Sequence, residues 1–193
     1  MTTRGASNLP TKEGKVLEQQ AYTANQTLIA ELLAAERLES WTGVSIDLVS
    51  GIDLVATIEQ RQVGIALRCR RSDYGSLTLS RHISDQYSQV HSLLKTLSDD
   101  CHYIAPAFIV QINGLDNESK ANGSVIRVNV REFARHLARL NRAGLLERFW
   151  SPHLMAYEFN EESLKGSLSI SGFVKFSVDK LGNLATQDIT DNQ

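Results

Sequence analysis

Apolar residues recur along the chain with two different periods, and the changes of period divide it into predicted elements. Within residues 16–41 leucines and isoleucines return every three or four positions, which predicts a long amphipathic helix with a break near residues 23–25. Three short apolar segments follow at 44–49, 52–59 and 63–70, and the last two alternate apolar and polar residues as strands do. The chain is therefore predicted to start with one helix and three strands.

The second and third of these strands are predicted to form an antiparallel hairpin. With a two-residue turn at Gln60 and Arg61, each apolar side chain of one strand meets an apolar side chain of the other. The same register places Asp53 directly opposite Arg68. Because this turn lacks the Asn-Gly pair of a tight hairpin, the register depends on apolar pairing alone. The predicted pairs are Ile58 with Val63, Ala56 with Ile65, Leu54 with Leu67, and Ile52 with Cys69.

The second half of the sequence continues with mixed periods. Segment 82–97 has helical spacing, 107–112 and 125–130 are short apolar strands around a polar loop, and 131–150 is helical again. Strands and helices alternate in this way in α/β folds. We therefore predict one α/β domain.

The two ends of the chain lack the pattern of the middle. Residues 1–13 have no apolar period and predict a flexible N-terminal arm, so that the α/β domain covers residues 14–150. In the C-terminal extension, 151–193, apolar residues alternate from 168 to 184 around an Asp-Lys-Leu-Gly turn, which predicts a β-hairpin. From residue 186 onward the polar tail is expected to be frayed.

Composition narrows the class of protein without naming its function. Hydrophobic residues make up 42% and charged residues 22%, which is typical of a globular domain. No apolar run reaches the roughly 18 residues of a membrane span, and the start lacks a secretory signal, so we expect a cytoplasmic protein with no membrane partner. The two cysteines are too few and too far apart for a disulfide framework or a zinc site. A net charge of -2 does not favour a generally basic nucleic-acid binder.

Local clusters of arginine must therefore carry any contact with nucleic acid. Arginines concentrate at 61–81 and 127–148, and in the second stretch Arg131, Arg135 and Arg139 recur every four residues. This spacing predicts a basic stripe on one helix face, which is either an ordinary solvated surface or a phosphate-contacting one. The candidate nucleic-acid contacts are Arg71, Arg81, Arg131, Arg135, Arg139 and Arg142.

Three short stretches resemble motifs of the PD-(D/E)XK nuclease-like superfamily, which includes Holliday-junction resolvases and many restriction enzymes. They are GKVLE at the start of the first helix, SGIDLVA at the second strand and IALRCRRS at the third. They are similar to a Gly-x-x-x-Glu helix start, an Asp-bearing strand and a strand that ends Glu-Cys-Lys-Ser. The resemblance covers residues 14–140 and implies a restriction-endonuclease-like αβββαβ core, in which helices flank a mixed central sheet.

The resemblance also assigns site residues, and two of them depart from the family. It places Glu18 at the helix glutamate and Asp53 at the strand aspartate, and it puts Arg68 and Arg70 where the family has its acid and its lysine. In the family, two carboxylates hold Mg²⁺, which polarises the phosphoryl group and activates a water. A cation at position 68 repels Mg²⁺ and removes an oxygen ligand, and a guanidinium stays protonated and cannot act as a base. Asp53 is then the one metal ligand carried over, so the resemblance implies a degenerate site that holds no cofactor, or Mg²⁺ if other acids complete it.

Each site residue also has an ordinary structural interpretation. Asp53 and Arg68 would form a cross-strand ion pair worth roughly 0.2–1 kcal/mol, and Glu18 would be a solvated helix residue. Three functions therefore stay open. The leading hypothesis is a nucleic-acid-associated, DNA-binding protein on a nuclease-like scaffold with an inactive metal site. The others are an adaptor subunit that binds protein partners in a phage or mobile-element assembly, and an active Mg²⁺-dependent endonuclease with rearranged acids.

Overall fold

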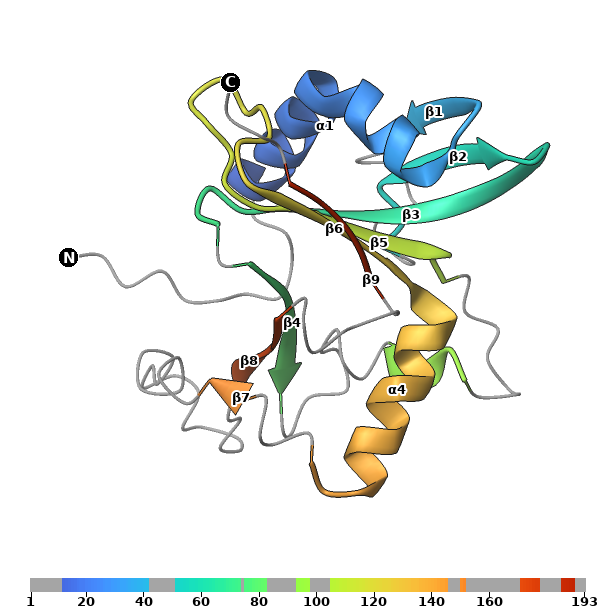
Figure 1. Cartoon of the computed structure of the whole chain (residues 1–193), viewed down its shortest axis with the longest axis vertical. Helices are drawn as coiled ribbons and strands as arrows, with labels where there is room; N and C mark the ends of the chain where they lie inside the picture. The colour runs from blue at the N-terminus through green and yellow to red at the C-terminus, as the bar shows by residue number, and fades with distance from the viewer. Residues whose placement is uncertain are drawn as a thin grey trace.

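The protein is described by a computed structural model. Its described residues form an α/β fold with helices on both sides of a mixed β-sheet (Figure 1). The general α/β class predicted from the sequence is confirmed. The structure describes residues 12–41, 51–73, 75–82, 93–97, 105–145, 150–151, 171–177 and 185–189.

Six strands make up the larger sheet, and helix α1 (Lys12–Leu33) precedes them in the chain. Their order across the sheet is β1-β2-β3-β5-β6-β9. The central neighbours β3 and β5 are parallel, whereas the other neighbouring pairs are antiparallel, so the sheet is mixed. The strands are β1 (Arg37–Ser40), β2 (Leu54–Ile58), β3 (Arg61–Cys69), β5 (Phe108–Ile112), β6 (Ser124–Asn129) and β9 (Ala185–Ile189).

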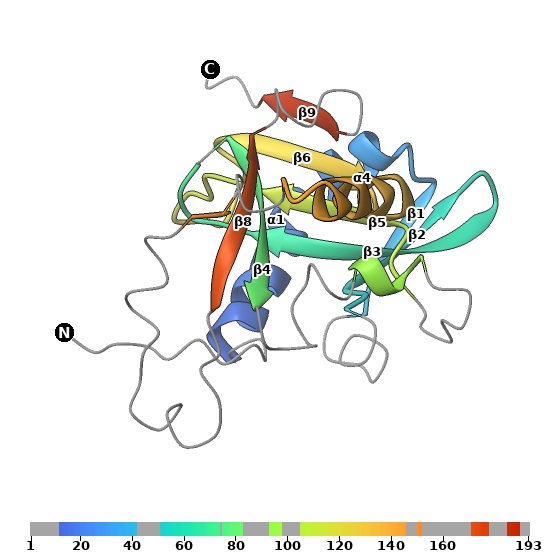
Figure 2. The same ribbon diagram turned by 90° about the horizontal axis from the view of Figure 1, so that it is seen from below.

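Three further strands form a smaller sheet, and helix α4 (Val130–Arg142) follows directly on β6. The order of the smaller sheet is β4-β8-β7, and both of its pairings are antiparallel. Figure 2 shows this sheet beside one end of the larger one. The strands are β4 (Ser76–His82), β7 (Trp150–Ser151) and β8 (Ser171–Ser177).

The two helices cover opposite faces of the larger sheet, as Figure 1 shows. Alternation along β3 sends Ile65 and Leu67 into the cluster of buried side chains that contains Ile29 of α1. Ala66 belongs to a second cluster, with Phe133 of α4 and residues of β4 and β6. Because successive strand residues face opposite sides, the even-numbered residues of β3 face α4 and β4.

Helix α1 has the predicted break, but it ends earlier than predicted. Asn25 has non-helical φ and ψ of -125° and 21° inside the helix, which confirms the break near residues 23–25. The helix begins at Lys12, inside the predicted flexible arm, and stops at Leu33, where Ala34 adopts a left-handed φ of 51°. Residues 37–40, predicted as helix, instead form the edge strand β1, which pairs with β2. The prediction was wrong because Leu38 happens to continue the helical spacing of the apolar residues before it. The strand predicted at 44–49 lies outside the described residues.

The hairpin of β2 and β3 exists, but the predicted register is wrong by two residues. The turn lies at Glu59 and Gln60, whose φ values of 48° and 62° match a tight two-residue turn with positive φ at both positions. Leu54 therefore pairs with Ile65, and Asp53 does not lie opposite Arg68. A shift of two residues keeps every side chain on its face, but Ile58 now lies opposite Arg61, so the turn with positive φ, and not complete apolar pairing, sets the register.

The strands β5 and β6 confirm the segments predicted at 107–112 and 125–130. Helix α4 begins one residue before its predicted start and ends at Arg142, where Gly144 takes a left-handed φ of 66°. Trp150, predicted to end this helix, lies in β7, where it pairs with Val174.

Residues 76–82 form β4, a strand that was not predicted from the sequence. The alternation of Leu77 and Leu79, both fully buried, is the strand pattern that was missed. Of the helix predicted at 82–97, His82 ends β4, residues 93–95 are helical, and residues 83–92 lie outside the described part of the chain.

The C-terminal extension differs from the prediction in both of its features. Strand β8 pairs with β4 and β7, and β9 pairs with β6, so these two described strands do not form a hairpin with each other. Residues 186–189, expected to fray, belong to β9 at the edge of the larger sheet. Strands β8 and β9 pair with strands far away in the sequence. Alternation of apolar residues predicts a strand but does not predict its partner.

Candidate functional site

The end of β3 places two arginines beside Asp53. Arg68 and Arg70 are two residues apart, and the alternation described above points position 68 toward the α4 side of the sheet. Asp53 directly precedes β2 and is buried. Its Oδ2 accepts a hydrogen bond of 2.7 Å from the backbone N–H of Leu67, and its own N–H donates to the carbonyl of Ile65 at 2.9 Å. Asp53 thus closes the end of the β2–β3 ladder, and its carboxylate bonds to the backbone of Leu67, the residue before the predicted partner Arg68.

Arg68 is a desolvated cation. Its Nε has almost no exposed surface and no hydrogen-bond partner among the described residues, although the residue as a whole is partly exposed. Burial first, and then the charge of Arg70, lower the pKa of Arg68 to about 10 against the opposite effect of Asp53 and Glu18. The guanidinium therefore stays charged at neutral pH at an energetic cost. The structure brings all four residues named by the resemblance within electrostatic reach of one another.

Cys69, between the two arginines, is an unreactive thiol. It packs against the cluster of buried side chains beneath α1. Burial raises the pKa of the Cys69 thiol well above its ordinary range, and the negative charges of Glu18 and Asp53 raise it further. Since the thiolate is the nucleophilic form, this position has a packing role.

The charges at this site balance without any added ion. Two carboxylates, Glu18 and Asp53, stand with two guanidiniums, Arg68 and Arg70. Among the described residues, no group of three or more His, Cys, Asp or Glu side chains is placed to hold a metal ion. Guanidinium groups can donate hydrogen bonds to phosphate oxygens, but they cannot lower the pKa of a water as a metal does.

A buried polar network beside the arginines was not foreseen from the sequence. Gln111 of β5 is the lateral neighbour of Arg68 in the sheet and is fully buried. Its amide donates to the carbonyl of Ser76 at 2.6 Å and to Oδ1 of Asn113 at 2.8 Å, and Asn113 donates to Oγ of Ser124 at 3.1 Å. The one available signal was a glutamine in the middle of the apolar strand FIVQI. The network joins β4 to the ends of β5 and β6.

Asp73 fastens the chain that leaves β3 onto the same network. It accepts hydrogen bonds from Gly75 N–H at 2.8 Å, Ser124 N–H at 2.9 Å and Ser124 Oγ at 2.8 Å. Burial acts to raise the pKa of Asp73, but the bonds from Gly75 and Ser124 outweigh it, and the pKa is lowered. A Cβ on Gly123 would lie 2.6 Å from Oδ2 of Asp73, so this close approach requires glycine.

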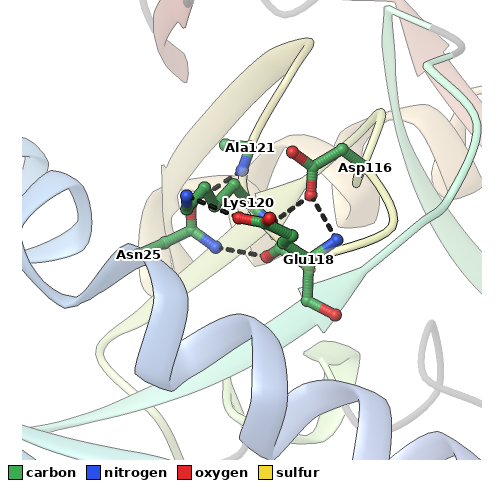
Figure 3. A network of polar contacts seen from close by, with 6 residues as sticks. Asn25, Asp116, Glu118, Lys120 and Ala121 are labelled. Carbon is green, nitrogen blue, oxygen red and sulfur yellow. Dashed lines mark hydrogen bonds and ion pairs between the residues drawn. The ribbon is translucent and has the colours of Figure 1, made fainter.

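The break in α1 holds the loop between β5 and β6. Figure 3 shows Asn25 reaching from the helix into this loop. Its Nδ2 donates to the carbonyls of Ala21 at 2.7 Å and Ser119 at 2.8 Å, and its Oδ1 accepts from Ala121 N–H at 2.7 Å. Asp116 orders the same loop by accepting from two of its backbone N–H groups. The kink is therefore a structural clamp.

Helix α4 confirms the predicted basic stripe as a structural feature. The four arginines of its stripe are exposed, and the opposite face of the helix buries Phe133 and Leu137. A shallow groove of about 420 Å³ runs along part of the stripe. Its role in binding nucleic acid stays a prediction. The arginines are Arg131, Arg135, Arg139 and Arg142, and the groove is lined by Leu97, Glu132, Arg135, Ala138, Arg139 and Arg142.

The remaining candidate arginines lie elsewhere. Arg71 is exposed just after β3, and Arg81 lies in β4, where its backbone pairs with Gly172 of β8. Neither residue belongs to α4, so neither is a member of the α4 stripe. Their role in contacting nucleic acid stays a prediction.

Comparisons with known proteins assign no family. No family model, curated protein or solved structure matches this chain. Within the part of the chain that the structure describes, no helix has the length and apolar character needed to cross a membrane. The geometry of the site is therefore the main basis for a functional proposal.

Proposed function

We propose that this protein binds nucleic acid on a nuclease-like scaffold and does not cleave it in a metal-dependent reaction. The observation that carries the proposal is a buried aspartate within electrostatic reach of two arginines at the end of β3. Asp53 is fixed by the N–H of Leu67, and the next residue, Arg68, places a desolvated cation where the resemblance expects an acid.

The order of elements supports the nuclease-like scaffold. Helix α1 is followed by the antiparallel strands β1, β2 and β3, then by a helical turn at 93–95, and then by β5, which lies parallel to β3. This is the order helix, three strands, helix, strand that the resemblance implies. Strand β4 departs from it, because it is inserted after β3 and belongs to the smaller sheet. Asp53 directly before β2 and Arg68 near the end of β3 support aligning the motifs with these two strands.

The charge balance at the site supports binding without cleavage. Magnesium sheds water reluctantly and needs near-octahedral oxygen ligation, so two carboxylates beside two guanidiniums make a poor site. Glu18 and Asp53 already have the cations Arg68 and Arg70 within reach. A divalent ion would have to compete with two fixed positive charges, and Coulomb repulsion over a few ångströms in a partly buried site opposes it.

Association with nucleic acid is supported by the surface charge of α4 and by the resemblance. The chain as a whole carries a net charge of -2, so a long-range attraction to nucleic acid is weak. A local row of exposed arginines supplies positive charge where a phosphate backbone could lie. An adaptor role in a protein assembly is the alternative that the same fold allows, and nucleic-acid binding separates the two.

A cleavage assay with a matched variant tests the proposal. The wild-type protein and Asp53→Ala would be incubated with labelled duplex, branched and single-stranded DNA in Mg²⁺ and in Mn²⁺, and both the bound fraction and the DNA length would be measured. We expect bound, intact DNA with the wild-type protein. Metal-dependent nicking by the wild-type protein that disappears in Asp53→Ala would establish the endonuclease alternative, and absence of binding to every nucleic acid would favour the adaptor alternative.

A further inference from the structure

The four arginines on α4 differ from two other exposed cations, Arg37 and Lys120, in having no acidic partner among the described residues. Arg37 forms an ion pair of 2.7 Å with Glu39, and Lys120 forms one of 2.7 Å with Glu118. Among the described residues, none of the four α4 arginines forms an ion pair, although Glu132 lies on the same helix. This surface therefore presents positive charge that no described side chain neutralises.

Stability of the helix explains only part of this row. Arg139 and Arg142 lie in the last turn, where cations interact favourably with the helix dipole. Arg131 lies in the first turn, where a cation opposes the dipole, and Arg135 lies in the middle, where the dipole has little effect. Two of the four positions are thus not accounted for by the helix itself.

The four arginines share one face of the helix at a regular spacing. With 3.6 residues per turn they fall within an arc of about 80°, and with a rise of 1.5 Å per residue they extend over about 16 Å. The buried residues Phe133 and Leu137 occupy the far side, so the arginine face points away from the sheet. A DNA strand carries one phosphate per 3.4 Å of helix axis, so a row of this length spans roughly four to five phosphates.

The groove beside the row adds an apolar wall to the charge. Leu97, from the segment 93–97, and Ala138 line the groove together with Arg135, Arg139 and Arg142. Aliphatic side chains of this kind can pack against sugar rings while guanidinium groups donate to phosphate oxygens. The groove offers charge and shape for a phosphate backbone, and the carboxylate of Glu132, which also lines it, repels any phosphate placed directly beside it.

From these observations we infer that the groove between α4 and residues 93–97 is the binding surface for the phosphodiester backbone of a nucleic acid, contacted without regard to base sequence. The inference rests on the proposed function and names the surface that performs it. It separates the binding surface from the end of β3, where Arg68 is desolvated and surrounded by acids. Arg135 and Arg139 are the central contacts, because both line the groove and both are exposed.

Equilibrium binding measured by fluorescence anisotropy over a series of salt concentrations tests the inference. Labelled single-stranded DNA and labelled duplex DNA serve as separate ligands. For Arg135→Ala with Arg139→Ala, we expect the Kd to rise by tens-fold at about 0.1 M salt and the slope of log K against log salt to lessen by roughly 1.4 to 1.8, the share of two phosphate contacts. A loss with either ligand supports the surface, and the ligand that shows it identifies the form of nucleic acid.

Two matched variants control for the loss of net charge and for the loss of the arginine side chain itself. Arg37→Ala with Arg61→Ala removes the same charge from exposed positions on β1 and β3, outside the groove, and is expected to change the Kd by no more than a few-fold. Arg135→Lys with Arg139→Lys retains the charge and is expected to keep most of the affinity. Equal weakening by the groove variant and the β1–β3 control would overturn the inference, because net charge alone would then explain the binding.

Failure of the inference can be distinguished from failure of the proposed function. If the wild-type protein binds DNA and the groove variant binds it equally well, the surface lies elsewhere and the proposed function stands. If the wild-type protein binds neither ligand at low salt, both fail. Unlabelled poly-glutamate and unlabelled DNA of equal charge would also be compared as competitors for the labelled DNA. If poly-glutamate competes as well as DNA, the surface binds an acidic protein partner and the inference is overturned.

Discussion

Two groups of arginines in this protein have the same chemistry and opposite surroundings. On β3, Arg68 is desolvated, near Asp53 and Glu18, and its Nε has no hydrogen-bond partner among the described residues. On α4, the arginines of the stripe are exposed, and no described carboxylate pairs with them. The charge of the β3 arginines is balanced by nearby carboxylates of the same chain. The charge of the α4 arginines is available to a ligand.

The difference teaches which property each group should control. A buried charge changes stability strongly, because desolvation and unpaired donors are costly in a medium of low polarity. An exposed charge on a helix changes stability little, but it contributes directly to binding a polyanion. Substitutions on β3 should therefore alter stability and metal affinity, and substitutions on α4 should alter ligand binding.

The largest expected effect is the appearance of a metal site when Arg68 and Arg70 are replaced. In Arg68→Glu with Arg70→Lys, a third carboxylate joins Glu18 and Asp53 and both guanidiniums are removed, leaving one ammonium, so we expect site-specific binding of Mn²⁺ or Mg²⁺ in calorimetry. The wild-type protein should show none. Adding Asp53→Ala to the double variant should abolish the binding, and stoichiometric binding by the wild-type protein would contradict the comparison.

A smaller effect is expected when Arg68 alone becomes apolar. Arg68→Met removes the desolvated cation and its unpartnered Nε, so we expect the free energy of unfolding at pH 7 to rise by about 1–3 kcal/mol. The folded pKa of about 10 lies below the reference value of 12.5, so the unfolded chain binds more protons between these values. Wild-type stability should therefore increase relative to the variant as the pH rises through 10, and the gap should narrow.

Chemical denaturation of both proteins at several pH values provides the measurement. A variant clearly less stable than the wild-type protein at pH 7 would mean that the attraction of Asp53 and Glu18 exceeds the cost of burial. Arg68 would then be a stabilising partner of the two carboxylates, and the first half of the comparison would be wrong.

The next effect concerns Asp73, in the segment that follows Arg68 and Arg70. Asp73→Asn replaces one acceptor oxygen with an NH₂ group that faces the N–H of Ser124, and we expect a loss of about 1 kcal/mol at pH 7. Because the folded pKa of Asp73 is lowered, its stabilisation is complete above the reference value of 3.8 and is lost as the pH falls through the folded value. The difference between the two proteins should thus close below about pH 4.

Thermal unfolding between pH 3 and pH 7 measures this difference, with the exposed Glu118→Gln as a control that changes one carboxylate outside the network. A difference that stays constant down to pH 3 would show that the charge of Asp73 is not what fastens the β3–β4 connection. The segment between β3 and β4 would then be held in place by other contacts than the charge of Asp73.

The smallest effect is expected on the exposed side. Arg135→Ala with Arg139→Ala should change the free energy of unfolding by no more than about 0.5 kcal/mol, since neither side chain is buried or paired among the described residues. Denaturant titration checks this value. A loss of several kcal/mol would mean that the stripe is structural, which would erase the contrast with β3.

The sequence predicted much of the sheet because its strands alternate clearly. The strands β2, β3, β5 and β6 and the basic face of α4 follow from local periods. What failed depended on partners far away in the chain. Strands β4 and β8 pair in a second sheet although Leu77 and its partner Phe176 are 99 positions apart, and no local pattern identifies such a partner. The register of the hairpin failed because Glu59 and Gln60 adopt positive φ without the glycine that marks it.

The candidate site was predicted in part, for a similar reason. The motifs brought Glu18, Asp53, Arg68 and Arg70 together, and the structure places their charges within reach of one another. The network around Gln111 could not be predicted, because a polar residue in an apolar strand does not show which buried carbonyls it will meet.

The central claim is that the protein binds nucleic acid through arginine contacts with phosphates. The most direct test is the Kd of the wild-type protein for labelled DNA across a range of salt concentrations, with the slope of log K against log salt as the result. Binding at low salt with a slope near -2 to -4, corresponding to roughly three to four phosphate contacts, is the result that agrees with the α4 stripe. No binding at low salt, or an affinity that does not depend on salt, would contradict the claim.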